Sequence, residues 1–311
     1  IYPVMVPFAR AGIERLHRDN PVAIAQSSSA APTKSYRAPP SPVTAKFDFQ
    51  RVPRDPLGRH RLSEPQLARL FALHAPVWTV VTVSDNDRIG RAKWENGRVV
   101  IDPAAPAMYQ YSSFTRFAGA VLLQLNYVVW FPARPIHGNF DLLAGHIDGL
   151  TWRVTLDQDG TPLLYDVMHN CGCYHQFYPT ARVVQHQSGD TMDEPLWVPL
   201  TLAPDPLAIT LAAGTHYVTA ITPATEPGIT LTVVDYNSLR SLPYDGSRRR
   251  GIFGNDGIIP GTERAEQFVL WPLGVPAPGA MRARGHHATA FIGHRHFDDP
   301  DLLDRYFGRR N

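Results

Sequence analysis

The chain has 311 residues, 44% of them hydrophobic and 19% charged, and its formal net charge is +2 at pH 7. This composition excludes an intrinsically disordered chain, and the length is sufficient to bury a substantial core. The nearly balanced charge gives no reason to expect nucleic acid as a partner, while 29 prolines and 23 glycines favour turns and short strands over long helices.

The N-terminal part of the sequence divides into a short helix and an extended arm. Residues 8–19 carry apolar side chains on one side of a predicted helix. Residues 27–42 are rich in Ser, Ala and Pro and have few large apolar side chains to offset the entropy of ordering, so we predict no regular structure there and a position outside the core. We therefore divide the chain into an N-terminal arm and linker, residues 1–45, and a single β-rich domain, residues 46–311. A protein partner is expected to bind through the arm.

A second helix is predicted to begin after Ser63, near the N-terminal third of the chain. Ser63 is a favourable N-cap residue, and Pro65 fits the first turn of a helix. Leu67, Leu70 and Leu73 then recur at helical spacing.

Beyond this helix, apolar and β-branched runs predict strands joined by short turns. The predicted strands cover residues 76–83, 99–101, 109–131 (two strands about Gly119), 150–156, 163–167, 207–211, 216–221, 229–234 and 267–271. Residues 301–307 predict a helix at the C-terminus. Strands with so little helix between them favour a mainly β fold, an antiparallel sandwich or barrel with a few short helices.

Two of these strands form a predicted hairpin that leads into the most unusual part of the sequence. The residues Asp-Gln-Asp-Gly at 157–160 form a turn signal between the strands at 150–156 and 163–167. Antiparallel pairing about this turn places Trp152 opposite Tyr165.

Extension of the same register brings Asp148 opposite His169 and His146 opposite Cys171, a geometry that a one-residue slip would change. In this arrangement His146 is a further metal ligand, and Asp148 either orients His169 or acts as a general base. We therefore predict Asp148 and His146 as catalytic residues. The alternative is that both side chains only solvate a loop.

One short segment contains the only two cysteines of the chain and two of its 13 histidines. His169, Cys171, Cys173 and His175 occupy alternate positions, so an extended chain would place all four on one face. The ligands of one tetrahedral metal ion lie within about 4 Å of one another, so the chain must fold back to form one site. Gly172 is the residue at which such a turn is easiest.

Three states of this segment are open from the sequence. Thiolates and imidazoles suit Zn²⁺ or Cu, which makes all four side chains candidate metal ligands. Cys171 and Cys173 could instead form a strained disulfide. In the third alternative, both thiols are buried as small apolar side chains.

A second histidine cluster lies near the C-terminus. His286, His294 and His296 share a parity and are further candidate metal ligands. Arg284 and Arg295 interleave with them and make the segment cationic, which favours two alternatives, contact with an anion or a solvated face.

The sequence contains no nucleophile elbow of a serine hydrolase, no HExxH zinc motif and no nucleotide-binding glycine loop. We therefore expect a metal- or thiol-site protein, a metal-dependent hydrolase or oxidoreductase that uses Zn or Cu at residues 169–175. The alternative is a non-catalytic accessory subunit of a cell-envelope assembly with a structural cysteine pair.

The location of the protein is expected to be periplasmic or extracellular. The chain begins with Ile1, as it would after removal of a signal peptide. Its longest apolar run, residues 117–131, is shorter than the ~20 residues that a transmembrane helix needs, so we expect no membrane span.

Overall fold

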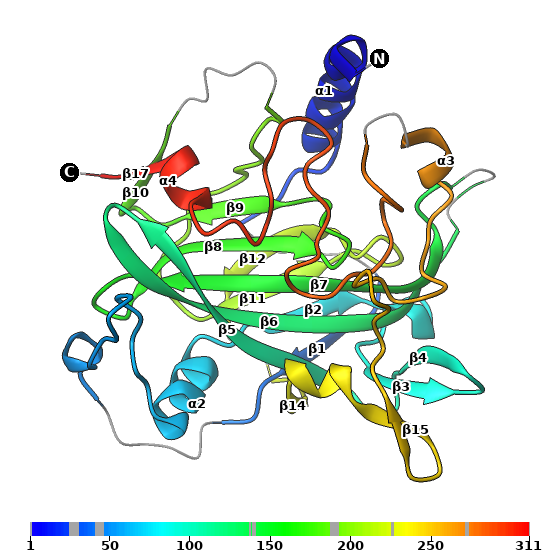
Figure 1. The fold of residues 1–311 in the computed structure, drawn as a ribbon, viewed down its shortest axis with the longest axis horizontal. Helices are drawn as coiled ribbons and strands as arrows, with labels where there is room; N and C mark the ends of the chain where they lie inside the picture. The colour runs from blue at the N-terminus through cyan, green and yellow to red at the C-terminus, as the bar shows by residue number, and fades with distance from the viewer. Residues whose placement is uncertain are drawn as a thin grey trace.

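Two open β-sheets face each other across a shared apolar core in the computed structural model (Figure 1). The structure describes residues 2–24, 31–40, 47–136, 138, 141–186, 193–224, 227–270 and 274–310. The five-stranded sheet has the order β12-β11-β2-β1-β13, formed by Val218–Pro223, Leu207–Leu211, Val77–Val81, Thr33–Arg37 and Ile229–Thr230. The six-stranded sheet has the order β14-β5-β6-β7-β8-β9, formed by Thr232–Asp235, Ala107–Phe117, Ala120–Arg134, Gly145–Leu156, Pro162–His169 and Gln176–Pro179.

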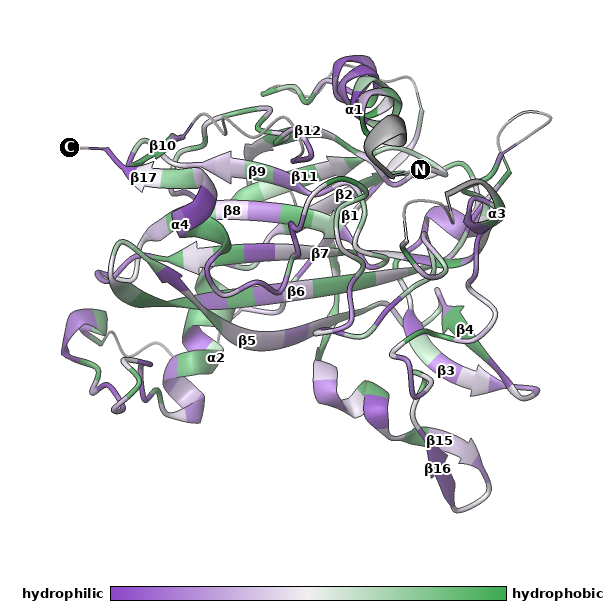
Figure 2. Cartoon of the chain, turned by 45° about the horizontal axis from the view of Figure 1, so that its top comes forward, coloured by the Kyte–Doolittle hydropathy of each residue, from purple (hydrophilic) through white to green (hydrophobic). Residues whose placement is uncertain are grey.

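Short ladders and helices complete the fold within the described residues. The ladders are β3–β4 (Arg91–Glu95 and Arg98–Asp102), β15–β16 (Leu242–Asp245 and Arg248–Arg250) and β10–β17 (Val183–Gln185 and Phe307–Arg309), of which the hydrophilic β15–β16 projects away from the sheets (Figure 2). The helices are α1 (Tyr2–Asp19), α2 (Glu64–Leu73), α3 (Gln267–Leu270) and α4 (Leu302–Tyr306), with 3₁₀ turns η1 (Phe49–Arg51), η2 (Asp85–Asp87) and η3 (Tyr236–Arg240). Among these described helices, none has the length and apolar character needed to cross a bilayer. The prediction of a mainly β fold with a few short helices is confirmed.

The inner faces of the two sheets form the main core. Trp78 and Ile209 on the five-stranded sheet belong to the same cluster as Tyr127, Trp152 and Val154 on the six-stranded sheet, and each of the five is at most 1% exposed. Burial of each such side chain contributes about 1.5–3 kcal/mol to folding. Two stacked open sheets are the arrangement of a sandwich, which was one of the two predicted architectures.

The strand pairing is only partly antiparallel. Strands β5 to β9 are antiparallel neighbours, as predicted. By contrast, β14 runs parallel to β5, β11 to β2, and β1 to β13. The parallel pairs join strands that are far apart in the chain, so no hairpin turn announces them in the sequence.

The Ser- and Pro-rich arm contributes a strand to the five-stranded sheet. The prediction that residues 27–42 lack regular structure is wrong for β1, which pairs with both β2 and β13. Tyr36 is only 2% exposed, and the Ser35 and Thr79 hydroxyls lie 3.2 Å apart. The composition argument failed because a strand between two neighbours is held mainly by backbone hydrogen bonds and needs few large side chains. Residues 25–30 and 41–46 lie outside the described residues.

The helices agree with the sequence except in one place. Ser63 forms a capping box with Gln66 at the start of α2, as predicted, and the helix predicted over residues 8–19 is confirmed but begins earlier, at Tyr2. The strand predicted over residues 267–271 is wrong, because its described part forms α3. A short apolar run does not by itself distinguish a strand from a buried helical turn.

The hairpin between β7 and β8 is confirmed, but its register differs from the prediction by two residues. Trp152 pairs with Val167 instead of Tyr165. The turn causes one residue of this difference, since Leu156 pairs with Pro162, and the β-bulge between Thr155 and Leu156 causes the other, since it inserts an extra residue on one side of the ladder.

The shift by two residues keeps every side chain on its predicted face. Leu150, not Asp148, is the pairing partner of His169, so Asp148 becomes the diagonal neighbour of His169. Because side chains alternate with a period of two, Asp148 and His169 still point to the same side of the sheet.

Asp157, in the turn of this hairpin, holds the C-terminal strand in place. Its carboxylate accepts hydrogen bonds from both Arg309 nitrogens, at 2.6 and 3.0 Å, and from Arg182 at 3.0 Å. The hydrogen bonds from Arg309 come first among the causes that lower the pKa of Asp157 to about 2.

Asp157→Asn is expected to lower the free energy of unfolding by about 1 kcal/mol at pH 7, because the arginine side chains are 36% and 44% exposed and solvent screens the pairs. A depressed carboxyl pKa stabilises the fold above the unfolded pKa of ~3.9, and this contribution is lost as the pH falls towards 2. Urea unfolding at pH 7 and pH 2.5 should therefore show a difference from wild type that shrinks in acid. Asp245→Asn, which removes a fully surface pair, is the control and should have little effect.

Candidate functional site

A chain of buried carboxylates and imidazoles joins the two sheets at one end of the sandwich. Asp148 and His169 come from β7 and β8, His216 from the turn between β11 and β12, and Asp87 from η2, which follows β2. All four are at most 4% exposed. His216 Nδ1 lies 2.7 Å from Asp148 Oδ2 and its Nε2 lies 3.7 Å from Asp87 Oδ1, while Asp148 Oδ1 lies 3.4 Å from His169 Nδ1.

The charges along this chain alternate. Burial lowers the pKa of His216, but its contacts with Asp148 and Asp87 outweigh burial and raise the pKa above its ordinary value. Burial raises the pKa of Asp148, yet His169 and His216 hold it well below the usual range. Burial lowers the pKa of His169 more than Asp148 raises it. At neutral pH, His216 is therefore an imidazolium between two carboxylates, and His169 is neutral.

The neutral His169 ring is oriented for chemistry. Its Nδ1 faces the Asp148 carboxylate, so the proton belongs on that nitrogen and Nε2 carries the lone pair. His169 Nε2 is buried and has no hydrogen-bond partner within the described part of the chain. The predicted contact between Asp148 and His169 is confirmed.

The cysteine segment folds back at Gly172, as predicted. The Gly172 N–H donates to the His169 carbonyl at 2.8 Å, and the Cys173 N–H faces Cys171 Sγ at 3.4 Å. Gly172 has φ +103°, and a Cβ there would lie 2.6 Å from the Ala288 nitrogen, so no other residue fits without displacement. Both cysteines are free thiols.

The two thiols interact with each other. A hydrogen bond with Cys171, followed by burial, raises the pKa of Cys173 well above its ordinary value. The Cys173 thiol is therefore protonated at neutral pH and is not an activated thiolate in this state.

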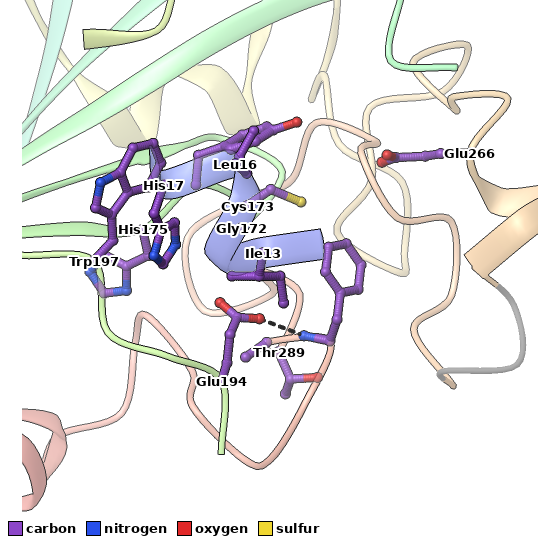
Figure 3. A pocket seen from close by; sticks show the side chains of 13 residues that line it. Ile13, Leu16, His17, Gly172, Cys173, His175, Glu194, Trp197, Glu266 and Thr289 are labelled. Atoms are coloured by element: carbon purple, nitrogen blue, oxygen red, sulfur yellow. Dashed lines mark hydrogen bonds between the residues drawn. The ribbon is translucent and has the colours of Figure 1, made fainter. Parts of the chain in front are cut away.

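Two cavities meet at this segment. The smaller one, about 20 Å³, is lined by Asp148, His169, both cysteines, Glu266 and two arginines, Arg134 and Arg264. The larger one, about 110 Å³, lies between α1 and the loop at residues 289–291 (Figure 3). Cys173, Tyr174 and Glu266 line both, and in Figure 3 the Cys173 sulfur and the Glu266 carboxyl point towards each other.

Glu266 is an unusual carboxyl group. It is 5% exposed, and its Oε1 has no hydrogen-bond partner among the described residues. Burial raises its pKa to about 7, against the opposing effect of Arg264. A carboxyl group that titrates near neutral pH and lines a cavity is suited to accept or donate a proton.

The backbone around the site is strained. Ile147, Tyr174 and His216 have φ of 55°, 57° and 54°, a region that residues other than glycine avoid and that is especially unfavourable for a β-branched side chain. Each such conformation costs about 1–3 kcal/mol and persists only where the surrounding structure enforces it. Clusters of strained residues are typical of functional sites.

His146 does not join the site. Its Nε2 lies 2.7 Å from the Val99 carbonyl oxygen, and in the ladder it is opposite Ala133 in β6. The prediction that His146 lies opposite Cys171 is therefore wrong. The left-handed backbone at Ile147 interrupts the regular alternation of β7, so His146 does not share the environment of Asp148.

His175 belongs to a different network. It was predicted to share one face with the two cysteines as a metal ligand, but its Nε2 is bound to Asp166 instead. Its Nε2 lies 2.7 Å from Asp166 Oδ2, and Asp166 also accepts two hydrogen bonds from Arg153. Arg153 in turn packs against the Phe297 ring, 3.7 Å from the ring centroid, and donates to its carbonyl. Tyr174, left-handed, lies between Cys173 and His175 and breaks the alternation on which the prediction depended.

The C-terminal histidines remain within their own loop. His286 and His294 are exposed, and His296 contacts the His287 carbonyl. Asp298 pairs with His287 at 2.8 Å. Within the described ranges, no three His, Cys, Asp or Glu side chains are already placed to hold one metal ion. The predicted set of seven ligands therefore does not assemble as a single group.

Sequence reasoning missed Asp87, His216 and Glu266. They come from three segments that are distant in the chain from residues 169–175, and none of them belongs to a recognisable motif. The only local signal was the position of His216 directly after the turn at 212–215, which places it at the end of the sandwich.

Comparison with protein-family models, with curated proteins and with solved structures found no match to this chain. The functional inference below therefore depends on geometry and chemistry alone.

His216→Gln is expected to lower the free energy of unfolding by about 3–5 kcal/mol near pH 6.5, because it leaves two buried carboxylates without their cation. The raised pKa of His216 means that its contribution is complete below the unfolded pKa of about 6.5 and declines as the pH rises towards the folded value. In urea unfolding experiments the difference in the free energy of unfolding between wild type and variant should decrease from pH 6.5 to 8.5. The exposed His286→Gln is the control, and a gap of the same size in both variants would contradict the ion chain.

Proposed function

We propose that this protein binds one zinc or copper ion through His169, Cys171 and Cys173, and that it is a metal-dependent hydrolase or oxidoreductase. The observation that carries the proposal is the unpartnered Nε2 of His169, with Nδ1 held by Asp148, in the wall of a cavity that also contains both thiols. A carboxylate that orients a histidine through its second nitrogen is the usual support of a metal-binding imidazole.

The small cavity is suited to a single ion. Its volume of about 20 Å³ exceeds the roughly 10–15 Å³ that one water molecule needs. Thiolates and a neutral imidazole are donors that both zinc and copper accept. Arg134 and Arg264 also line the cavity, and their charge would balance the extra negative charge of two thiolates and the Glu266 carboxylate.

Binding would require small local changes. A cysteine coordinates a metal ion as its thiolate, so the Cys173 thiol, whose pKa is raised, would have to lose its proton when the ion binds. Since the donors are not yet arranged around one centre, short side-chain rotations must accompany this deprotonation. Metal affinity should therefore increase with pH.

The open side of the site favours catalysis over a structural role. Three protein ligands leave one coordination position for water, which is the pattern of catalytic zinc. Glu266 lines both cavities, and its unpartnered oxygen could accept a proton from such a water. Zinc would supply a bound water of lowered pKa, whereas copper would supply electron transfer.

Metal analysis of protein prepared without a histidine tag tests the proposal directly. About one equivalent of zinc or copper is expected in wild type, and little in His169→Ala or Cys171→Ser, because each removes a ligand. His175→Ala and His294→Ala are the matched controls and should retain the metal, since both side chains lie in other networks. Equal metal content in all four variants, or none in wild type, would contradict the site.

The orienting role of Asp148 has a separate test. Asp148→Asn is expected to weaken metal binding by about 10–100-fold, as is usual for the loss of such a supporting carboxylate. Asp157→Asn, at the far end of the same strand, should leave affinity unchanged although it affects stability. Competition with a coloured chelator measures both, with near-ultraviolet circular dichroism as the check of folding.

A thiol oxidoreductase is the second candidate, favoured by the direct contact between the two free thiols. In this reaction the Cys173 sulfur attacks a partner disulfide and forms a mixed disulfide, which releases one partner thiol. The Cys171 sulfur then attacks the Cys173 sulfur, and the second partner thiol leaves. The cysteine pair loses two electrons and two protons, and the partner disulfide becomes two thiols. Metal-free protein whose thiols interconvert with a disulfide in glutathione buffer would support this candidate over the first. Location outside the cytoplasm and the role of accessory subunit stay predictions.

A further inference from the structure

We propose that the larger cavity is a substrate pocket for a small uncharged molecule with an apolar body and an N–H or O–H head. The role of this cavity as a substrate pocket rests on the function proposed above. Its preference for an uncharged ligand follows from the cavity walls alone. Its volume of about 110 Å³ is smaller than the roughly 150 Å³ cavity that accommodates benzene, so the ligand portion inside it has about four to six non-hydrogen atoms.

The apolar body has a complementary wall. Ile13 and Leu16 from α1 line the cavity together with Trp197 and Phe291, which come from two other segments of the chain. His17 stacks on Trp197 with ring centroids 4.5 Å apart, and this stack closes one side of the cavity. Burial lowers the pKa of His17 to about 4, so this ring adds no charge at neutral pH.

The polar part of the wall accepts hydrogen bonds and disfavours anions. Among the described lining residues there is no Lys or Arg, and the Nε2 atom of His175 is already held by Asp166. Glu194 is already occupied, since Arg295 and the Phe291 N–H each contact one of its oxygens. Glu266 therefore offers the free acceptor, and a second anion beside this desolvated carboxylate would be repelled.

The head of such a ligand would lie next to the reactive groups. Glu266 and Cys173 line both cavities, so a molecule bound against Glu266 is also beside the Cys173 sulfur. This position connects the pocket to the proposed metal and thiol chemistry.

Alkylation of Cys173 by two reagents of similar size tests the preference. Iodoacetamide is uncharged and has an N–H head, whereas iodoacetate is an anion. Both react with the same thiolate, so the small thiolate population cancels in the ratio of their rate constants. Metal-free protein in the presence of a chelator is used at pH 8, and tandem mass spectrometry assigns the modification to Cys173. The ratio of iodoacetamide to iodoacetate rates should be at least about tenfold higher in the folded protein than in urea, because the Glu266 carboxylate lines the larger cavity and repels the anion, whereas Arg134 and Arg264 line only the small one.

Two comparisons test whether the selectivity comes from Glu266 and from this cavity. Glu266→Gln should return the ratio towards the value in urea, mainly by accelerating iodoacetate. Leu16→Trp should fill the cavity and slow both reagents, while Phe8→Trp on the exposed part of the same helix should slow neither. A folded ratio equal to that in urea, or unchanged rates in Leu16→Trp, would overturn the pocket.

The outcome is distinguishable from that of the metal analysis. If Cys173 prefers iodoacetamide to iodoacetate but the protein binds no metal, the proposed pocket is supported and the proposed metal site is contradicted. A stoichiometric metal without such selectivity would reject the pocket and keep the metal site.

Discussion

The pairing of buried charge is the constraint on which this structure depends. Asp87 and Asp148 are removed from water at the end of the sandwich, and an isolated carboxylate there would be very unfavourable. His216 lies between them and compensates both. Because Asp148 belongs to one sheet and His216 and Asp87 to turns that border the other, this compensation also fixes how the two sheets meet at this end.

The same pairing of charges determines the state of His169, which lines the small cavity with the two cysteines. Beside the anionic Asp148, His169 stays neutral with its Nδ1 held by that carboxylate. Of the strained residues, His216 belongs to this chain and Ile147 precedes Asp148, so the ion pairs and the core around them must supply the energy that their conformations require. The fold and the geometry of the small cavity thus depend on the same few contacts.

Some of this site could be predicted and some could not, as the β7–β8 hairpin shows. The turn and the bulge after Thr155 together moved the register by two residues, yet Asp148 and His169 still met because a two-residue error preserves the face of the sheet. The prediction that His146 and His175 lie beside the cysteines failed, although it relied on the same alternation of side chains between the two faces of a strand. In each case a left-handed neighbour, Ile147 or Tyr174, ended the alternation without any warning from its side chain.

The sequence by itself determined the features that depend on neighbouring residues. These are the mainly β fold, the Ser63 cap, the hairpin turns and the fold-back at Gly172, since each follows from patterns within a few positions. Only the tertiary structure decided that β1 enters a sheet, that His216 pairs with Asp148, and that Glu266 lines the same cavities as Cys173. Those contacts depend on how two twisted sheets stack and which loops meet at their ends, and short-range patterns contain no information about that packing.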